Sequence, residues 1–375
     1  MSAKVLEIFN ENPGLRSRGF LPPRDPRISI SAYSGCKGLD EIGRNLPSLL
    51  MDPHFRDYAK TLSFSVWESK PTRSALPSLR LAYIRLGFLA SGYVHQLGQE
   101  TAKVIPRNIA VPLVRVCRYL ARPPILSYDG YALYNWKRFR KDEPIALGNI
   151  DTIQNFVHLY DEHWFILVHV EIEAIAARIL NVIWHVSQPQ KGSKEDYKSL
   201  VDSALVIMSE AVGSMTHVLR RIPDHMDPAL YYRTFRPYIK PFDNIVYEGC
   251  FDNKPQSFRG ETGAQSSILP TLVAFMKIPH ASSILTDHLA DMRKYMPHEH
   301  RTLIETAERL PDIRRIADKE KYNALLDAIA EFRSVHYGWA VSYIRERTND
   351  PCGTGGTPYR EWLKQLIDET LAHKK

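Results

Sequence analysis

One histidine interrupts an apolar helix face near the C-terminal end of the sequence. Residues at alternating steps of three and four are apolar or aromatic, namely Leu325, Ile329, Phe332, Trp339 and Tyr343. This spacing predicts a helix with one face toward a core, and His336 stands where the pattern requires a hydrophobe. A neutral imidazole in such surroundings needs hydrogen-bond partners or a metal ion. The spacing alone leaves both open, and the hydrogen-bonded core histidine is the commoner case.

Two further features could carry chemistry. Arg236 follows a group of aromatic residues, so it is either a surface arginine lying along them or a bidentate clamp for a carboxylate. Two Gly-rich stretches, RGETGAQSS (259–267) and GTGGT (353–357), are either flexible turns or loops that present backbone N–H groups to a ligand. The sequence contains no Walker A, GxGxxG, HExxH or GxSxG motif.

Helices must position these residues, because β-strand signals are weak and short throughout the sequence. The pattern predicts a helix over 161–186 and another that begins after Ser193, with Asp196 completing an approximate capping box. Further helices are expected over 228–239, 267–276, 281–294, 298–309 and 318–347. The C-terminal part is therefore predicted to be a large helical domain.

The N-terminal part has a different character. Residues 1 to about 50 are rich in Pro, Gly and Ser, which predicts an irregular segment that wraps the surface. A helix is expected over 78–98, followed by a Pro-rich connector over 104–136 with a short helix at 112–120. The fold class is predicted as mainly α, with a small N-terminal domain and connector over residues 1–120 and a large domain over 121–375.

Composition excludes several classes of protein. The net charge of +7 is spread along the chain without a block of like charges, so we expect no nucleic-acid partner. Four dispersed cysteines without a CxxC pair argue against a zinc site and a disulfide framework. The most apolar stretch, 164–186, carries charged residues and predicts no membrane span, and no signal peptide is apparent. We expect a cytoplasmic protein that is a monomer, with oligomers left open.

Several motifs together resemble one family. They are PRNIAVPL (106–113), RPPILSYDGYALYNW (122–136), VYEGC (246–250), GAQSS (263–267), MRKYMPHEHR (292–301), FRSVHYGWAV (332–341) and GTGGT (353–357). Their order and spacing resemble those of indoleamine 2,3-dioxygenases over about residues 15–370. The resemblance implies that a haem b lies between helices of the large domain, closed over by a small N-terminal domain and a connecting loop.

The resemblance also assigns residues on the cofactor. His336 matches the proximal ligand of the haem iron, which would be a neutral imidazole on a rigid helix. Arg333, Gly263 and Ala264 match positions beside the cofactor. Thr354 matches a mobile loop that closes on bound substrate and approaches a haem propionate.

On the substrate side, Arg236 matches the arginine that pairs with the substrate carboxylate, and it is flanked by Tyr231. The residues matched to the indole pocket are Tyr128, Tyr131, Ala132, His163, Trp164 and Leu167. His163 would accept the indole N–H or donate to dioxygen, or it points to solvent. Glu261 and Thr262 match a loop at the pocket, where the carboxylate would meet a substrate ammonium, another loop or water.

The reaction implied is insertion of O2 across the indole C2–C3 bond of L-tryptophan or a related indoleamine, which gives N-formylkynurenine. Two alternatives stay open. One is a haem enzyme of the same superfamily with an altered indole substrate or rearrangement chemistry, and the other is a haem-binding protein without catalysis. Retention of Arg236 favours an enzyme.

Overall fold

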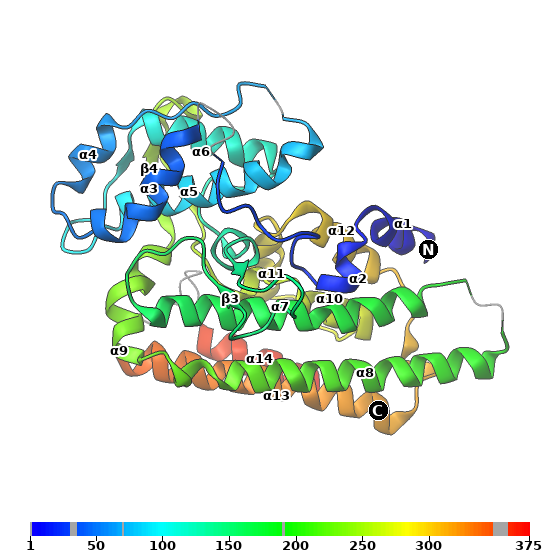
Figure 1. The fold of residues 1–375 in the computed structure, drawn as a ribbon. Coiled ribbons are helices and arrows are strands. Elements are labelled where there is room, and N and C mark those ends of the chain that lie inside the picture. The colour runs from blue at the N-terminus through cyan, green and yellow to red at the C-terminus, as the bar shows by residue number, and fades with distance from the viewer. Residues whose placement is uncertain (1, 31–35, 70, 190–191, 348–358) are drawn as a thin grey trace.

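Two layers make up the molecule in the computed structural model, which describes residues 2–30, 36–69, 71–189, 192–347 and 359–375. The lower layer in Figure 1 consists of long helices that lie side by side, and the upper layer consists of shorter helices and a small sheet. The connector that precedes the long helices lies between the layers. The mainly α fold predicted from the sequence is confirmed.

Four helices frame the lower layer: α7 (Tyr160–Val186), α8 (Lys194–Arg220), α13 (Lys319–Tyr343) and α14 (Tyr359–Ala372). Helix α8 packs against both α7 and α13, and α14 covers another side of α13. The predicted capping box at the start of α8 is confirmed, since the Ser193 hydroxyl accepts from the Asp196 N–H and the Asp196 carboxylate accepts from the Ser193 N–H. At the start of α13 the Asp318 side chain is an N-cap, since it accepts from the Lys321 N–H.

Shorter helices close the lower layer beside α7. They are α9 (Pro228–Leu230), α10 (Ile268–Met276), α11 (Ile284–Arg293) and α12 (His298–Ala307). Between α9 and the sheet the chain makes a π-helical turn, η5 (Tyr231–Phe235), and a 3-10 turn, η6 (Arg236–Ile239). A second π-helical turn, η3 (Asp129–Leu133), lies in the connector. Such turns are rare and occur often at functional sites.

The upper layer is built around α5 (Leu76–Val94), which is apolar on nearly every side and therefore buried on nearly every side. Around it lie α3 (Lys37–Leu49), α4 (Phe55–Thr61) and α6 (Arg107–Tyr119). Strand β4 (Phe242–Tyr247) pairs parallel with β1 (Val104–Ile105) and antiparallel with β5 (Gln256–Phe258). A separate ribbon joins β2 (Lys137–Arg138) to β3 (Ile150–Asp151).

The N-terminal segment corrects one prediction. Residues expected to be irregular form α1 (Ser2–Glu11) and α2 (Gly14–Arg18) as well as α3, so the prediction for residues 1 to about 50 is wrong. Pro and Gly separate these short helices rather than exclude them. Gly19, with φ of 63°, lets the chain approach α7 so closely that a Cβ would lie 2.0 Å from the Glu173 carbonyl oxygen.

Each of the two layers has its own hydrophobic core. One joins α3–α6, the connector and β4, and the other joins α7, α8, α10, α12 and α13. Val5, Phe9 and Phe20 belong to the second core, so the first twenty residues pack with the large helical part. A division of the chain at residue 120 stays a prediction.

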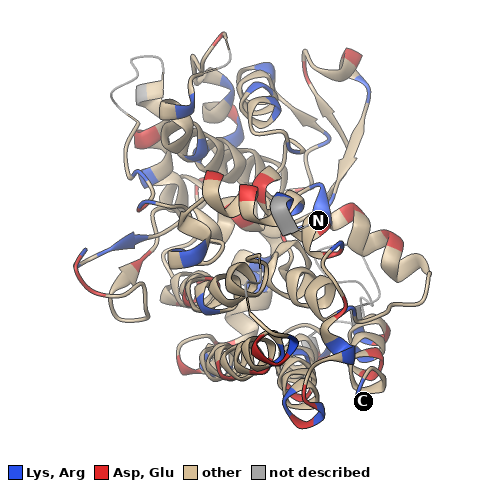
Figure 2. Cartoon of the chain, turned by 90° about the vertical axis from the view of Figure 1, so that its right-hand side faces the viewer, with Lys and Arg blue, Asp and Glu red and all other residues tan. Residues whose placement is uncertain are grey.

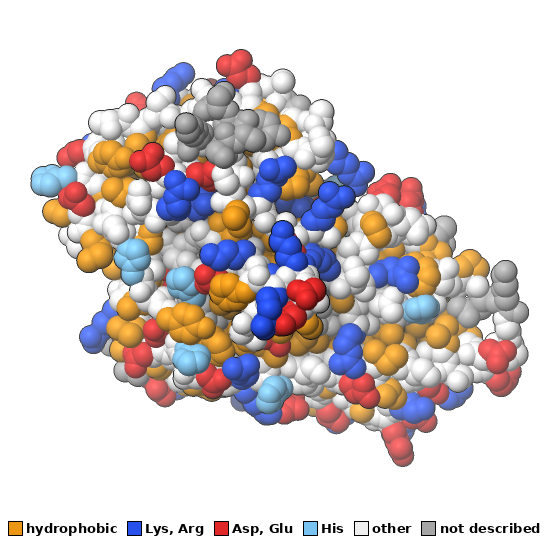
Figure 3. Space-filling view, viewed as in Figure 1, with side chains coloured by type: hydrophobic (Ala, Val, Ile, Leu, Met, Phe, Trp, Pro, Cys, Tyr) orange, Lys and Arg blue, Asp and Glu red, His pale blue; other side chains and the backbone are white. Residues whose placement is uncertain are grey.

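The surface carries both signs of charge. Lys and Arg alternate with Asp and Glu over most elements (Figure 2), and basic side chains gather with acidic ones at the junction of the layers on the face in Figure 3. Across the part of the chain that the structure describes, no helix combines the length and apolar character needed to cross a membrane.

Candidate functional site

His336 lies on α13, where the helix ceases to be buried. Leu325 and Ile329 are fully buried, whereas His336 is exposed. Even so, burial by surrounding protein, and then the nearby His169, lowers the pKa of His336 to about 4. Open space therefore adjoins the His336 ring, although protein surrounds the side chain. At neutral pH the imidazole is uncharged, as a metal ligand must be.

The loop 260–267 approaches this imidazole. A Cβ placed on Gly263 would meet only the His336 Nε2, at 3.9 Å, so any larger residue would project a side chain at that nitrogen. The loop is held at both ends: Gln265 Nε2 donates to the Gly260 carbonyl at 2.9 Å, and Ser266 Oγ donates to Glu173 at 2.6 Å. Thr262 and Ala264 lie partly buried on either side of Gly263.

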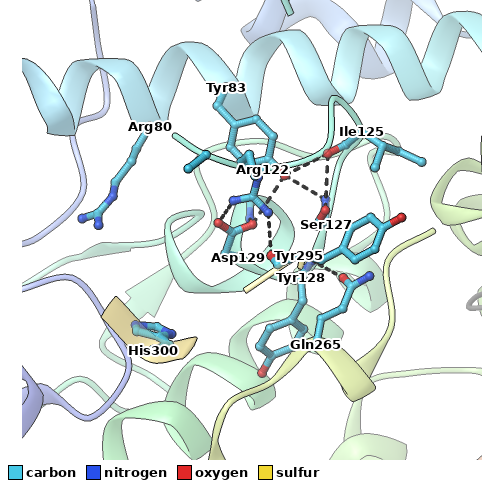
Figure 4. Close-up of polar contacts among 12 residues, drawn as sticks. Arg80, Tyr83, Arg122, Ile125, Ser127, Tyr128, Asp129, Gln265, Tyr295 and His300 are labelled. Carbon is cyan, nitrogen blue, oxygen red and sulfur yellow. Dashed lines mark hydrogen bonds and ion pairs between the residues drawn. The ribbon is translucent and has the colours of Figure 1, made fainter. Parts of the chain in front are cut away.

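The connector brings two tyrosines to the same space. A buried ion pair between Arg122 and Asp129 and the Tyr83 hydroxyl, which donates to the Ile125 carbonyl, fix the turn (Figure 4). The Tyr128 N–H donates to the Gln265 side chain at 2.9 Å and so ties the connector to the loop 260–267 (Figure 4). The turn requires glycine at position 130, since a Cβ there would lie 2.5 Å from the Tyr83 ring.

Two buried glutamates of α7 hold the tyrosine hydroxyls. Tyr131 donates to Glu162 at 3.2 Å, and Tyr128 donates to Glu173 at 2.8 Å. Burial raises the pKa of each carboxyl to about 7, although hydrogen bonds oppose the shift. The tyrosine rings are therefore fixed on α7 with little rotational freedom.

The face of α7 toward this space carries Phe165 and His169. The Phe165 ring lies 4.6 Å from the His169 ring and 5.6 Å from the Tyr231 ring, centroid to centroid. His169 Nδ1 lies 2.7 Å from the Phe165 carbonyl oxygen, which can only accept, so Nδ1 carries the proton. Burial lowers the pKa of His169, which leaves Nε2 as an acceptor on a neutral ring.

Arg236 begins the turn η6 directly after Tyr231–Phe235. It is 2% exposed, and its guanidinium lies 5.0 Å from the Tyr232 ring centroid. Tyr231 is also buried, and its hydroxyl is near enough to Arg236 for the cation to oppose the rise in the tyrosine pKa to about 12 that burial causes. A buried arginine beside an aromatic wall can bind a carboxylate with two parallel hydrogen bonds.

The structure gathers most of the residues predicted from the sequence. Those around the space are His336, Gly263, Ala264, Thr262, Glu261, Tyr128, Tyr131, Ala132, Tyr231 and Arg236. Glu261 belongs to this group because its charge raises the pKa of Tyr131, after burial and Glu162. Ala132 is buried in the same turn as Tyr131.

Other predicted residues lie elsewhere. His163 Nδ1 contacts Asp151 at 2.9 Å at the start of α7. Trp164 packs on His225 and donates to the Arg221 carbonyl, and Leu167 is buried in the upper core. Arg333 donates to the Leu366 carbonyl and to Thr370 on α14. Thr354 lies outside the described residues.

Sequence reasoning missed Phe165, His169 and Glu173. The three recur every four residues, which places them on one face of α7, whereas residues 163, 164 and 167 fall on other faces. The available signal was the pair His169 and Glu173, two ionisable residues four positions apart in an otherwise apolar stretch, which indicates a polar site on one helix face. In the sequence alone they only interrupt the apolar stretch 164–186.

The arrangement fits a haem on observations of the structure itself. His336 is a neutral imidazole beside open space, and within the described residues no hydrogen bond contributes to its pKa. Gly263 leaves the approach to Nε2 free of a side chain. Aromatic rings and carboxyl-held tyrosines complete the group, so a flat apolar cofactor whose iron would be held by His336 matches the residues present.

Comparison with known proteins gives the same assignment. The family model of indoleamine 2,3-dioxygenase matches residues 14–351. Indoleamine 2,3-dioxygenase 1 of Rattus norvegicus is 28% identical, over 88% of this chain and 87% of its own length. Indoleamine 2,3-dioxygenase 2 of Homo sapiens is 30% identical, over 78% of each chain.

A myoglobin of Haliotis madaka is 25% identical, over 88% of this chain and 90% of its own length. The family model nevertheless covers most of the chain, and haem is the cofactor of that family. The chain therefore belongs to the indoleamine 2,3-dioxygenase family of haem-dependent dioxygenases.

Proposed function

We propose that the protein inserts O2 across the indole C2–C3 bond of L-tryptophan or a related indoleamine and produces N-formylkynurenine. The observation that carries the proposal is a buried arginine, Arg236, that lies beside Tyr231. The Tyr231 ring packs on Phe165, Phe165 packs on His169, and His169 acts on the neutral His336. A group of this kind can take a flat apolar ring together with a carboxylate. When bound on His336, the haem supplies the activation of dioxygen.

The chain's own residues orient the substrate. Arg236 binds the carboxylate, and the rings of Phe165, Tyr131 and Tyr231 enclose the indole. His169 Nε2 accepts the indole N–H, because Nδ1 is committed to the Phe165 carbonyl. Holding the reacting bond in a fixed pose in a water-poor space is the protein's main contribution to the rate.

The decisive experiment is aerobic incubation of the reduced, haem-loaded protein with L-tryptophan, with N-formylkynurenine followed by its absorbance. We expect turnover. Absence of product from L-tryptophan, D-tryptophan and tryptamine alike would reject the proposal.

A second candidate is reversible dioxygen binding without catalysis, which the similarity to the Haliotis madaka myoglobin favours. The same incubation separates the two, because an oxygen carrier keeps a stable dioxygen spectrum in the presence of tryptophan. Arg236 argues for the enzyme, since an oxygen carrier has no use for a buried carboxylate clamp.

A further inference from the structure

Glu261 is a buried carboxyl that the proposed orientation of the indole does not use. It is 4% exposed, and burial alone raises its pKa to about 8. Glu162 and Glu173 reach only about 7, because hydrogen bonds to their carboxylates oppose the effect of burial. Among the described residues, no hydrogen bond or cation lowers the pKa of Glu261.

The surroundings of Glu261 are the tyrosines of the site. After burial and nearer partners, its charge raises the pKa of Tyr128 and of Tyr131, and it acts in the same direction on Tyr231. Tyr128 and Tyr131 already donate to Glu173 and Glu162. Their hydroxyl protons are thus engaged with other carboxyls, while the charge of Glu261 acts on all three tyrosines.

Glu261 and Arg236 lie on neighbouring segments. The Glu261 N–H donates to the Ile239 carbonyl at 3.1 Å, at the end of the turn η6 that Arg236 begins. Tyr231 senses both groups, since Arg236 lowers its pKa and Glu261 raises it, each after the larger effect of burial. A buried cation and a buried carboxyl therefore both act on one tyrosine.

We propose that Glu261 binds the α-ammonium group of an amino-acid substrate while Arg236 binds its carboxylate. The two side chains form a zwitterion subsite that selects amino acids over indoles that lack an amino group. The inference rests on the proposed function and adds the group that recognises the amine.

The electrostatic argument has two parts. Burial keeps the Glu261 carboxyl mostly protonated near neutral pH, because the ionised form is costly without a partner. An ammonium group that arrives with the substrate pairs with the carboxylate, offsets this cost and favours release of the proton. The α-carbon of an amino acid bears both charged groups, so a ligand held by Arg236 brings its ammonium to the adjacent side of the pocket. A tyrosine hydroxyl cannot replace that cation, because it carries no charge.

The test compares three ligands on the haem-loaded protein by isothermal titration calorimetry. L-Tryptophan carries both groups, tryptamine only the ammonium and indole-3-propionate only the carboxylate. In Glu261→Gln we expect roughly tenfold or greater weakening for L-tryptophan and tryptamine, as for loss of a charge-assisted hydrogen bond. Binding of indole-3-propionate should be unchanged or tighter.

Glu173→Gln is the matched control, since Glu173 is also a buried glutamate but is held by Tyr128 and Ser266. It should change the affinities of the three ligands by similar factors. Glu261→Met, which also removes the charge, should reproduce the pattern of Glu261→Gln, and the haem spectrum and melting temperature report whether each variant is folded.

Equal weakening of all three ligands in both Glu261 variants would assign the residue to the indole or to the fold and overturn the inference. No weakening for any ligand would overturn it as well. If the wild-type protein itself binds no L-tryptophan, the proposed function fails and the subsite fails with it. If the wild-type protein binds L-tryptophan but the Glu261 variants do not discriminate among the three ligands, only the ammonium subsite is rejected and the proposed function stands.

Discussion

At the scale of single residues, two imidazoles of the candidate site interact electrostatically from different helices, His336 on α13 and His169 on α7. They have different surroundings. His169 is committed through Nδ1 to a carbonyl of its own helix, whereas Nε2 of His336 would lie 3.9 Å from a Cβ placed on Gly263. Sequence spacing identified His336 as unusual, and only the resemblance gave it a role.

Replacement of His336 by Ala should abolish stable haem incorporation, because no other axial ligand is proposed for the iron. The measurement is the haem absorbance of the purified protein after reconstitution. His217→Ala, which removes an exposed histidine of α8, is the control and should retain haem. A normal haem spectrum in His336→Ala would refute the ligand.

Replacement of Arg236 by Ala should lower kcat/KM for L-tryptophan by at least about tenfold, which corresponds to about 1.4 kcal/mol and is the minimum expected of a charge-assisted pair. Arg233→Ala provides the comparison, since Arg233 lies on the exposed side of the same turn. Equal activity in the two variants would exclude Arg236 from substrate binding.

His169→Ala and His163→Ala test whether the substrate meets His169, as the geometry of α7 indicates, or His163, as the family resemblance implied. We expect His169→Ala to lower kcat/KM by roughly tenfold through loss of a hydrogen bond to the indole. His163→Ala should have little effect, because His163 contacts Asp151 outside the aromatic group. The opposite order of the two effects would restore the sequence prediction.

At the scale of elements, α7, the connector and the loop 260–267 meet at Glu173. Its Oε1 accepts from Tyr128 of the connector and from Ser266 of the loop. Oε2 is buried without a hydrogen-bond partner among the described residues. One carboxyl therefore fixes the relative position of three elements that line the site.

This junction has a definite pH dependence. Burial raises the pKa of Glu173 from 4.5 to about 7, so the folded state holds a proton that the unfolded chain releases above pH 4.5. The proton on Glu173 therefore adds to the free energy of unfolding. This contribution is on the order of 3 kcal/mol, is complete below pH 4.5 and is lost as the pH rises through 7.

Denaturant unfolding of the wild type and Glu173→Gln at pH 5 and pH 8 measures this effect. The wild type should lose unfolding free energy relative to the variant between the two pH values. The difference between the proteins cancels the opposing contribution of the buried histidines, whose pKa values are lowered. A pH-independent difference would show that Glu173 does not titrate in this range.

Helix patterning predicted the elements better than the side-chain directions within them. The helices from 161 onward follow the apolar period, so their predicted positions agree with α7, α8, α10 and α13. The family resemblance could not show which face of α7 points toward the site, because a shift of one residue in the match rotates the chosen side chain by about 100° around the helix axis. Buried charge partners such as Arg122 with Asp129 depend on tertiary approach and leave no local signal.

At the scale of the whole molecule, the first twenty residues belong to the core of the large helical part. Phe9 is 1% exposed and packs in the core that includes α7, α8 and α13. The Pro- and Gly-rich composition of this segment concealed its short helices, since α1 has only 10 residues and α2 only 5.

Phe9→Ala should therefore lower the free energy of unfolding by about 3–5 kcal/mol, the usual effect of truncating a buried phenylalanine. Phe139→Ala is the matched control: Phe139 is 63% exposed, and its loss should change stability by less than about 0.5 kcal/mol. Thermal melting followed by circular dichroism compares the two. Similar melting temperatures would show that the N-terminal helices do not contribute to the large core.

The loop 260–267 also has a consequence for divergence within the family. Its two ends are anchored, at Gly260 by Gln265 and at Ser266 by Glu173, while position 261 lies between them against the tyrosines. On the proposal that Glu261 binds the substrate ammonium group, a substitution at this position would change which amine is accepted without moving a helix. Substrate preference could then vary at this one position while the two anchors of the loop stay in place.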